Sequence, residues 1–154
     1  MSLYVRQLAW LNTAPDAAKG QKQKPPIRLL RMKEDGIAVE LPPNPTPYLT
    51  DWLMEIGPTA STGMGPAVLA WGEIEAWARQ IGINLTTWEA RTLRRLSRDF
   101  LDQMNKAKEP ACPAPFTTRA DNDEAVSKQF ERMFRAMAAN QKAQGAKSAR
   151  KINK

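Results

Sequence analysis

The sequence predicts a mainly α-helical protein, with a small three-helix core, an N-terminal β-hairpin and a C-terminal amphipathic helix. Three observations predict this class. Four of the five tryptophans lie within residues 47–104, where apolar residues recur at helical spacing. The ends of these helices carry capping residues, glycine or proline. Most of the twelve prolines lie outside this stretch, so we expect a core of about 60 residues with extensions on both sides.

Residues 1–46 form the N-terminal extension. Residues 1–11 are apolar but follow neither period, and we expect a short strand or a turn of helix there. Residues 12–26 have the composition of a linker. The apolar runs 27–32 and 37–41 flank Asp35-Gly36, and because glycine accepts the positive φ of a tight turn, this pattern predicts a β-hairpin over 27–41.

The predicted helical core spans residues 47–106 and follows a proline-rich approach. Thr46 as N-cap and Pro47 at the first helical position predict the start of the first helix, which Gly57 ends. Its apolar stripe consists of Tyr48, Leu49, Trp52, Leu53 and Ile56. The glycine-rich stretch 58–66 lacks the Gly-Lys-Ser/Thr ending of a phosphate-binding loop, so we expect a flexible connection.

The second and third core helices have clear boundaries. The second is predicted over residues 70–81, with Gly82 as its stop. The third begins at Thr86, which forms a Thr-x-x-Glu capping box with Glu89. The two apolar stripes consist of Trp71, Ile74, Trp77, Ala78 and Ile81, and of Ala90, Leu93, Leu96, Phe100 and Met104.

Four arginines of the third helix, Arg91, Arg94, Arg95 and Arg98, suggest contact with nucleic acid. Spacing of four residues allows Arg95 to pair with Asp99 and Arg98 with Asp102, which favours a salt-bridged surface instead. A recognition helix offers side chains near its N-terminus to bases, and Thr87, Trp88 and Glu89 are poor choices there. We therefore do not expect this helix to read DNA.

Beyond the core, residues 107–120 are predicted to form a proline-rich linker. Its Cys112 has no neighbouring base or second sulfur, so neither a nucleophile nor a metal ligand is expected. Residues 121–139 are predicted to form an amphipathic helix, which packs on the core or docks in a partner's groove. Its stripe consists of Val126, Phe130, Met133, Phe134 and Met137. Residues 140–154 have the composition of a disordered basic tail.

The composition points away from catalysis. The chain has no histidine, and no dinucleotide fingerprint, P-loop or metal-ligand spacing appears. We expect no enzyme activity, no cofactor and no metal. No apolar run is long enough to span a membrane, and a single cysteine fits a reducing compartment, so a cytoplasmic protein is expected.

The net charge of +7 is concentrated at the C-terminal end. Residues 125–154 carry eight basic side chains and one acidic side chain, which equals the whole imbalance. Such an end either contacts nucleic acid or keeps the chain soluble.

Four segments of the core carry a family resemblance through their order and spacing. They are Pro47–Trp52, Gly63–Pro66, Glu73–Ala78, and Leu85–Arg91 followed by Leu93–Leu96, and they span over a third of the chain. Together they resemble a family of small proteins of tailed bacteriophages, encoded near the tape-measure gene and described as tail assembly chaperones. Family members often have proline at Thr87, and serine or threonine at Ala70, where this chain lacks that helix cap.

The resemblance implies a non-catalytic late protein of the host cytoplasm that binds the tape-measure protein and helps recruit tail tube subunits. The partner contacts we expect are Phe130, Met133, Phe134 and Met137, with Trp88, Arg91 and Arg94 as a second set. Two alternatives remain open. One is a nucleic-acid-binding accessory protein that acts through the basic tail, and the other is a structural tail component retained in the virion.

Overall fold

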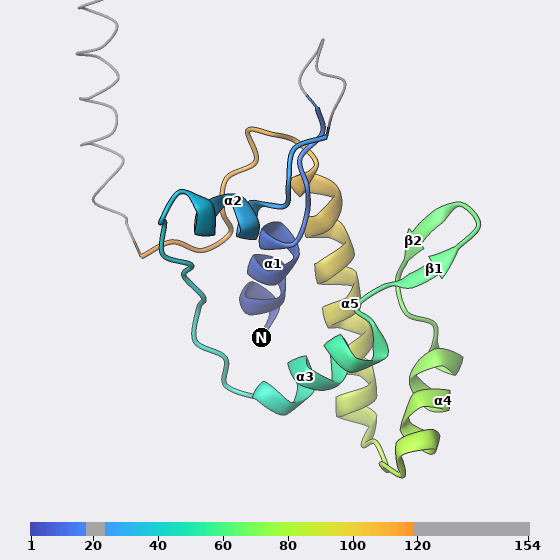
Figure 1. The fold of residues 1–154 in the computed structure, drawn as a ribbon. Coiled ribbons are helices and arrows are strands. Elements are labelled where there is room, and N and C mark those ends of the chain that lie inside the picture. The colour runs from blue at the N-terminus through green and yellow to red at the C-terminus, as the bar shows by residue number, and fades with distance from the viewer. Residues whose placement is uncertain (18–23, 119–154) are drawn as a thin grey trace, which may run out of the picture. The chain divides into compact units, whose positions relative to one another are not determined.

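A computed structural model describes residues 1–17 and 24–118, and its helices and strands belong to one compact unit, Met1–Thr117. In chain order they are α1 (Ser2–Leu11), α2 (Arg28–Glu34), α3 (Pro47–Ile56), β1 (Ala60–Thr62), β2 (Gly65–Ala67), α4 (Trp71–Ile81) and α5 (Thr87–Ala107). The fold of the described residues is thus mainly helical, with one short antiparallel hairpin (Figure 1). The predicted amphipathic helix 121–139 and basic tail 140–154 lie outside the described residues.

The helix α5 is the element on which the others pack. Its capping box forms as predicted, because the Thr86 hydroxyl accepts a hydrogen bond from the Glu89 amide and the Glu89 carboxylate accepts one from the Thr86 amide. It packs most extensively against α1 and then against α3 and α4 (Figure 1). The central cluster consists of Val5, Ala9, Leu49, Leu53, Leu69, Ile74, Leu93, Leu96 and Phe100.

Residues 1–11 are therefore part of the core, and the predicted three-helix core is too small. They form the ten-residue helix α1, where Val5 and Ala9 are fully buried. Gln7 is buried as well. Its side-chain nitrogen donates a hydrogen bond to the Glu40 carbonyl, and its side-chain oxygen accepts one from the Phe116 backbone amide, so that it contacts two flanking segments. A helix covered on several sides has apolar residues around much of its circumference, and this is why the sequence shows no single stripe.

The predicted β-hairpin over 27–41 is wrong. Residues 28–34 form the helix α2, and Gly36 (φ 67°) ends it in a Schellman motif, with hydrogen bonds from the Ile37 amide to the Met32 carbonyl and from the Gly36 amide to the Lys33 carbonyl. Positive φ at a glycine serves a hairpin turn and a helix end equally. Asp35-Gly36 thus does form a tight turn, but this turn ends a helix and does not join two strands.

The hairpin of this structure lies in the stretch expected to be a flexible connection. β1 and β2 pair in an antiparallel register, with Thr62 opposite Gly65 across a turn of Gly63 and Met64. The Thr62 hydroxyl donates a hydrogen bond to the Gly65 carbonyl across this turn and accepts one from the Met64 amide. At the base, the Leu69 amide donates to the buried Ser97 hydroxyl at 2.9 Å, which fixes the hairpin exit to α5.

The helices α3 and α4 follow the prediction closely. Pro47 occupies the first turn of α3 and Gly57 follows its end, but the Thr46 hydroxyl makes no capping hydrogen bond. Gly82 (φ 72°) ends α4, with hydrogen bonds from the Ile83 amide to the Ala78 carbonyl and from the Gly82 amide to the Arg79 carbonyl. The Trp52 ring makes an edge-on contact with Tyr48 within α3, and a second edge-on contact with Trp77 joins α3 to α4.

The described part of the predicted linker, residues 107–118, is held against α1. Trp10 donates from its indole nitrogen to the Cys112 carbonyl at 2.9 Å. The Phe116 amide donates to Gln7 at 3.1 Å. The prolines stiffen this segment, and these contacts place it on the core instead of leaving it as a spacer.

Arg28 closes the C-terminal end of α5. Its side chain is 8 % exposed and donates to the carbonyls of Thr13, Ala107 and Glu109 at 3.2, 2.6 and 2.9 Å. Its guanidinium also lies 4.9 Å from the centre of the Trp10 ring. Burial lowers the pKa of Arg28 from its ordinary value, but arginine stays charged in proteins. The cation therefore satisfies the carbonyls that a helix leaves open at its C-terminus.

Candidate protein-binding site

A groove of about 580 Å³ lies between α4 and the start of α5. It exists because the Schellman motif at Gly82 turns the chain away from α4, and because the capping box at Thr86 starts α5 four residues later. The lining is Trp71, Ile74, Glu75, Ala78, Arg79, Gly82, Ile83, Asn84, Leu85 and Ala90. Apolar side chains form most of it, and Glu75 and Arg79 are its charged residues.

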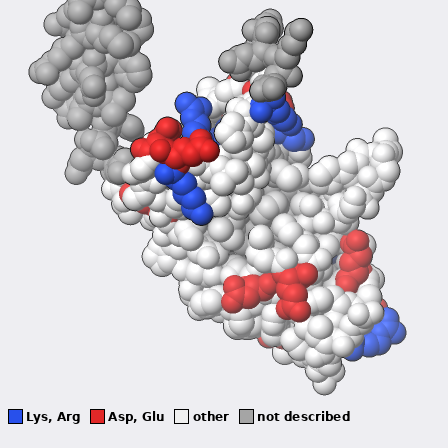
Figure 2. All heavy atoms as spheres, viewed as in Figure 1, with Lys and Arg blue, Asp and Glu red and all other residues white. Residues whose placement is uncertain are grey.

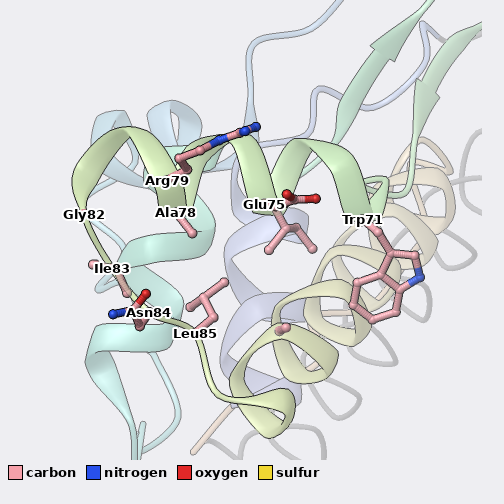
Figure 3. Close-up of a pocket in the computed structure, with 10 residues that line it drawn as sticks. Trp71, Glu75, Ala78, Arg79, Gly82, Ile83, Asn84 and Leu85 are labelled. Atoms are coloured by element: carbon pink, nitrogen blue, oxygen red, sulfur yellow. The ribbon is translucent and has the colours of Figure 1, made fainter.

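The close-up in Figure 3 shows how these side chains lie. Ala78 and Leu85 point into the space between α4 and the connection to α5, and Trp71 lies at the other end, over α5. Trp71 is 51 % exposed although it begins the apolar stripe of α4. The described part of the chain leaves this large apolar surface open to solvent, which is typical of a site for a ligand or a partner.

A second, smaller hollow of about 120 Å³ adjoins the groove on the side of α5. Its lining consists of Trp71, Arg91, Arg94, Arg95 and Arg98. The Arg94 guanidinium lies 5.0 Å from the centre of the Trp71 ring, a cation–π contact that orients both side chains. Trp71 therefore belongs to both hollows, and an apolar surface passes directly into a cationic one.

The ion pairs predicted for this face do not form. Within residues 1–17 and 24–118, the ion pairs shorter than 4 Å join Lys24 to Asp16 and Arg31 to Asp35. The expected partner of Arg95, Asp99, turns its Oδ2 atom into a buried position where no hydrogen-bond donor meets it in the described structure. Favourable spacing along a helix permits such a pair but does not ensure it.

The acidic residues gather elsewhere on the described surface. Figure 2 shows one face, on which Asp and Glu lie over α3 and α4, and also over α2 next to Lys and Arg, while wide areas carry no charge. The four arginines all belong to α5. The groove therefore separates an acidic helix from a basic one.

The predicted contact residues fall into two sets. Arg91 and Arg94 line the smaller hollow, and Trp88 is 53 % exposed but lines neither hollow. Phe130, Met133, Phe134 and Met137 lie outside the described residues. Neither Trp71 nor the connection 82–85 carries a signal in the sequence for its place in the groove, because a groove depends on how two helices meet.

The described residues contain no cluster of His, Cys, Asp or Glu suited to hold a metal ion. Among them, no helix combines the length and hydropathy needed to cross a membrane. Cys112 is half-buried, and the side-chain amide of Gln103 lies 3.7 Å from its sulfur atom.

No protein family model matches this chain, and neither the curated proteins nor the solved structures contain a match. The function must therefore be argued from the site.

Proposed function

We propose that the protein is a non-catalytic phage tail assembly chaperone of the host cytoplasm, which binds the tape-measure protein and helps recruit tail tube subunits. The groove between α4 and α5 is the observation that supports this most. An apolar groove between helices suits the apolar face of an amphipathic helix. In this proposal the tape-measure protein is a long chain of helices with repeated apolar stripes. It needs a partner that covers these stripes while they are exposed to solvent.

The position of the groove agrees with the family resemblance. Two of the four segments that carry it lie on α4, on the connection and on α5: Glu73–Ala78, and Leu85–Arg91 followed by Leu93–Leu96. Groove-lining residues Ile74, Ala78, Leu85 and Ala90 are in or beside these segments. Five of the ten residues that line the groove thus belong to segments that carry the resemblance.

Residues 121–139 supply a second proposed contact. The stripe of Phe130, Met133, Phe134 and Met137 has the adaptable methionines that suit an extended helical partner. In this proposal the groove holds one segment of the tape-measure protein and the stripe covers another. Two weak contacts on one chain then act together through their effective concentration.

Co-expression with the tape-measure protein tests the proposal. We expect the tape-measure protein to become soluble and to co-purify with the full chain. Ile83→Asp, which places a charge in the groove, should reduce co-purification at least about tenfold, since a buried charge without a partner costs several times the 1.4 kcal/mol that a tenfold change represents.

Ile81→Asp is the matched control, because Ile81 is 41 % exposed and lies two residues away, outside the groove lining. Circular dichroism should show the same helix content for both variants. If the tape-measure protein stays insoluble and unbound beside the wild-type chain, the proposal is wrong. Phe130→Asp combined with Phe134→Asp tests the second contact in the same assay, and mass spectrometry of purified particles distinguishes a chaperone from a retained tail component.

A further inference from the structure

The four arginines of α5 form a cationic surface that has no ion-pair partner among the described residues. Arg91, Arg95 and Arg98 are exposed and Arg94 is half-buried. Seven residues separate the first from the last, about two turns or 10 Å of helix. No carboxylate of the described residues lies within 4 Å of any of them. Like charges at such spacing repel one another, so an anion from outside the chain would stabilise this surface.

Trp71 connects this surface to the apolar groove. It lines both hollows, and the Arg94 guanidinium packs on its ring at 5.0 Å. A ligand that fills the groove and continues past Trp71 must therefore meet the arginines. One ligand that contacts both surfaces needs apolar and anionic groups side by side.

From this arrangement we infer that the groove binds an amphipathic helix whose flank beside the apolar stripe is acidic, and that the four arginines recognise that flank. The inference rests on the proposed function, because it names the chemistry of the partner helix in the same site. Guanidinium groups bind carboxylates in a planar, two-bonded geometry. The apolar groove then supplies affinity, and the arginines fix the register and direction of the bound helix.

Two observations favour an acidic helix over a nucleic-acid strand. One face of the Trp71 ring already carries the Arg94 guanidinium, so that face is not open for stacking on a base. The Glu73 and Glu75 carboxylates lie on α4, with Glu75 in the groove lining, where they would repel a chain of phosphates. A helix can orient its acidic flank toward α5 alone, whereas every residue of a nucleic acid carries a charge.

A pair of synthetic helical peptides tests the inference on the full chain. Both peptides carry the same leucine stripe, and the flank is glutamate in one and glutamine in the other. Fluorescence anisotropy should show the glutamate peptide binding at least about tenfold more tightly at low salt, a difference that high salt reduces. Arg91→Gln with Arg98→Gln should remove this preference while the affinity for the glutamine peptide stays the same.

Lys106→Gln with Lys108→Gln is the matched control, since it removes two exposed charges at the far end of α5. Equal binding of the two peptides, or binding of neither, would overturn the inference. Tighter binding of a single-stranded DNA oligonucleotide than of the glutamate peptide would also overturn it, and would assign the surface to nucleic acid. Failure of the tape-measure co-purification with the peptide preference intact would reject the proposed function alone.

Discussion

The two ends of α5 differ in what covers them. At the C-terminal end, α1 packs along the helix, residues 112–116 are held by Trp10 and Gln7, and Arg28 caps the last carbonyls. At the N-terminal end, α4 leaves the groove open and Trp71 exposed. One helix thus joins a closed end, which supports the fold, to an open end that is available for binding. Substitutions should affect stability at the closed end and association at the open end.

The largest expected effect is the loss of a core side chain near the closed end. Phe100 is 7 % exposed and belongs to the central cluster. Phe100→Ala should lower the free energy of unfolding by about 3–5 kcal/mol, because the cavity it leaves cannot close fully. Ile83→Ala in the open groove should cost less than about 1 kcal/mol. Urea unfolding followed by tryptophan fluorescence measures both, and equal losses would contradict the comparison.

Substitution of Arg28 should cause the next largest loss of stability. Arg28→Met keeps much of the apolar stem but leaves the carbonyls of Thr13, Ala107 and Glu109 without their donor. We expect a loss of about 2–3 kcal/mol, since buried acceptors retain their desolvation cost. Arg31→Met on the exposed side of α2 is the control and should cost less than about 1 kcal/mol. Thermal unfolding of the two variants compares them directly.

Ser97 tests the boundary between the two ends. Ser97→Ala leaves the buried Leu69 amide without its acceptor and should cost about 1–3 kcal/mol. Hydrogen exchange should show faster exchange of the Leu69 amide, together with the amides that pair β1 with β2. Unchanged exchange would mean that the hairpin is held by other contacts.

Substitutions at the start of α5 should lower the free energy of unfolding by less. Thr86→Ala removes one half of the capping box and should cost about 1 kcal/mol. Thr87→Ala, one residue later, removes no side-chain cap and should be close to neutral. A chemical denaturation series on both variants resolves this difference, and equal losses would argue against the capping role.

The smallest effect is a pH dependence at the same cap. The Thr86 amide and then the Thr86 hydroxyl donate to Glu89 and hold its pKa below the ordinary value of 4.5. A carboxyl with a lowered folded-state pKa stabilises above its unfolded pKa, and this stabilisation is lost as the pH falls through the folded value. We expect the stability difference between wild type and Glu89→Gln to shrink below about pH 4.5. A constant difference from pH 7 to low pH would contradict this account.

Two glycines explain how far the fold could be predicted from sequence. Gly36 and Gly82 both end helices in Schellman motifs. The sequence predicts the helix end at Gly82 correctly, because an apolar stripe with helical period precedes this glycine. Only seven residues form the helix before Gly36, which is too few to show a helical period. The Asp-Gly pair therefore predicts a hairpin at this place. The helix α1 was missed for a related reason, since contacts on several sides erased its single stripe.

The site was harder to predict than the fold. Arg91 and Arg94 were named as partner contacts, and they do line the cationic hollow. The spacing of Trp71 predicts an apolar stripe on α4, but spacing shows which residues share a face and not whether another element covers that face. The expected ion pair of Arg95 with Asp99 does not form, and the Asp99 Oδ2 atom is buried instead. Such features depend on how helices meet and have no signal along the chain.

The closed end also constrains how the protein is made. Its contacts join Trp10 to Cys112, Gln7 to Phe116 and Arg28 to Ala107, across 102, 109 and 79 residues of chain. During synthesis α1 emerges from the ribosome before α5, and it stays without its main packing partner until α5 and the segment behind it emerge. Contacts of such separation also slow folding relative to a bundle of local hairpins. A nascent chain stopped before residue 100 therefore exposes the apolar side chains of α1, which makes it a substrate for general folding chaperones.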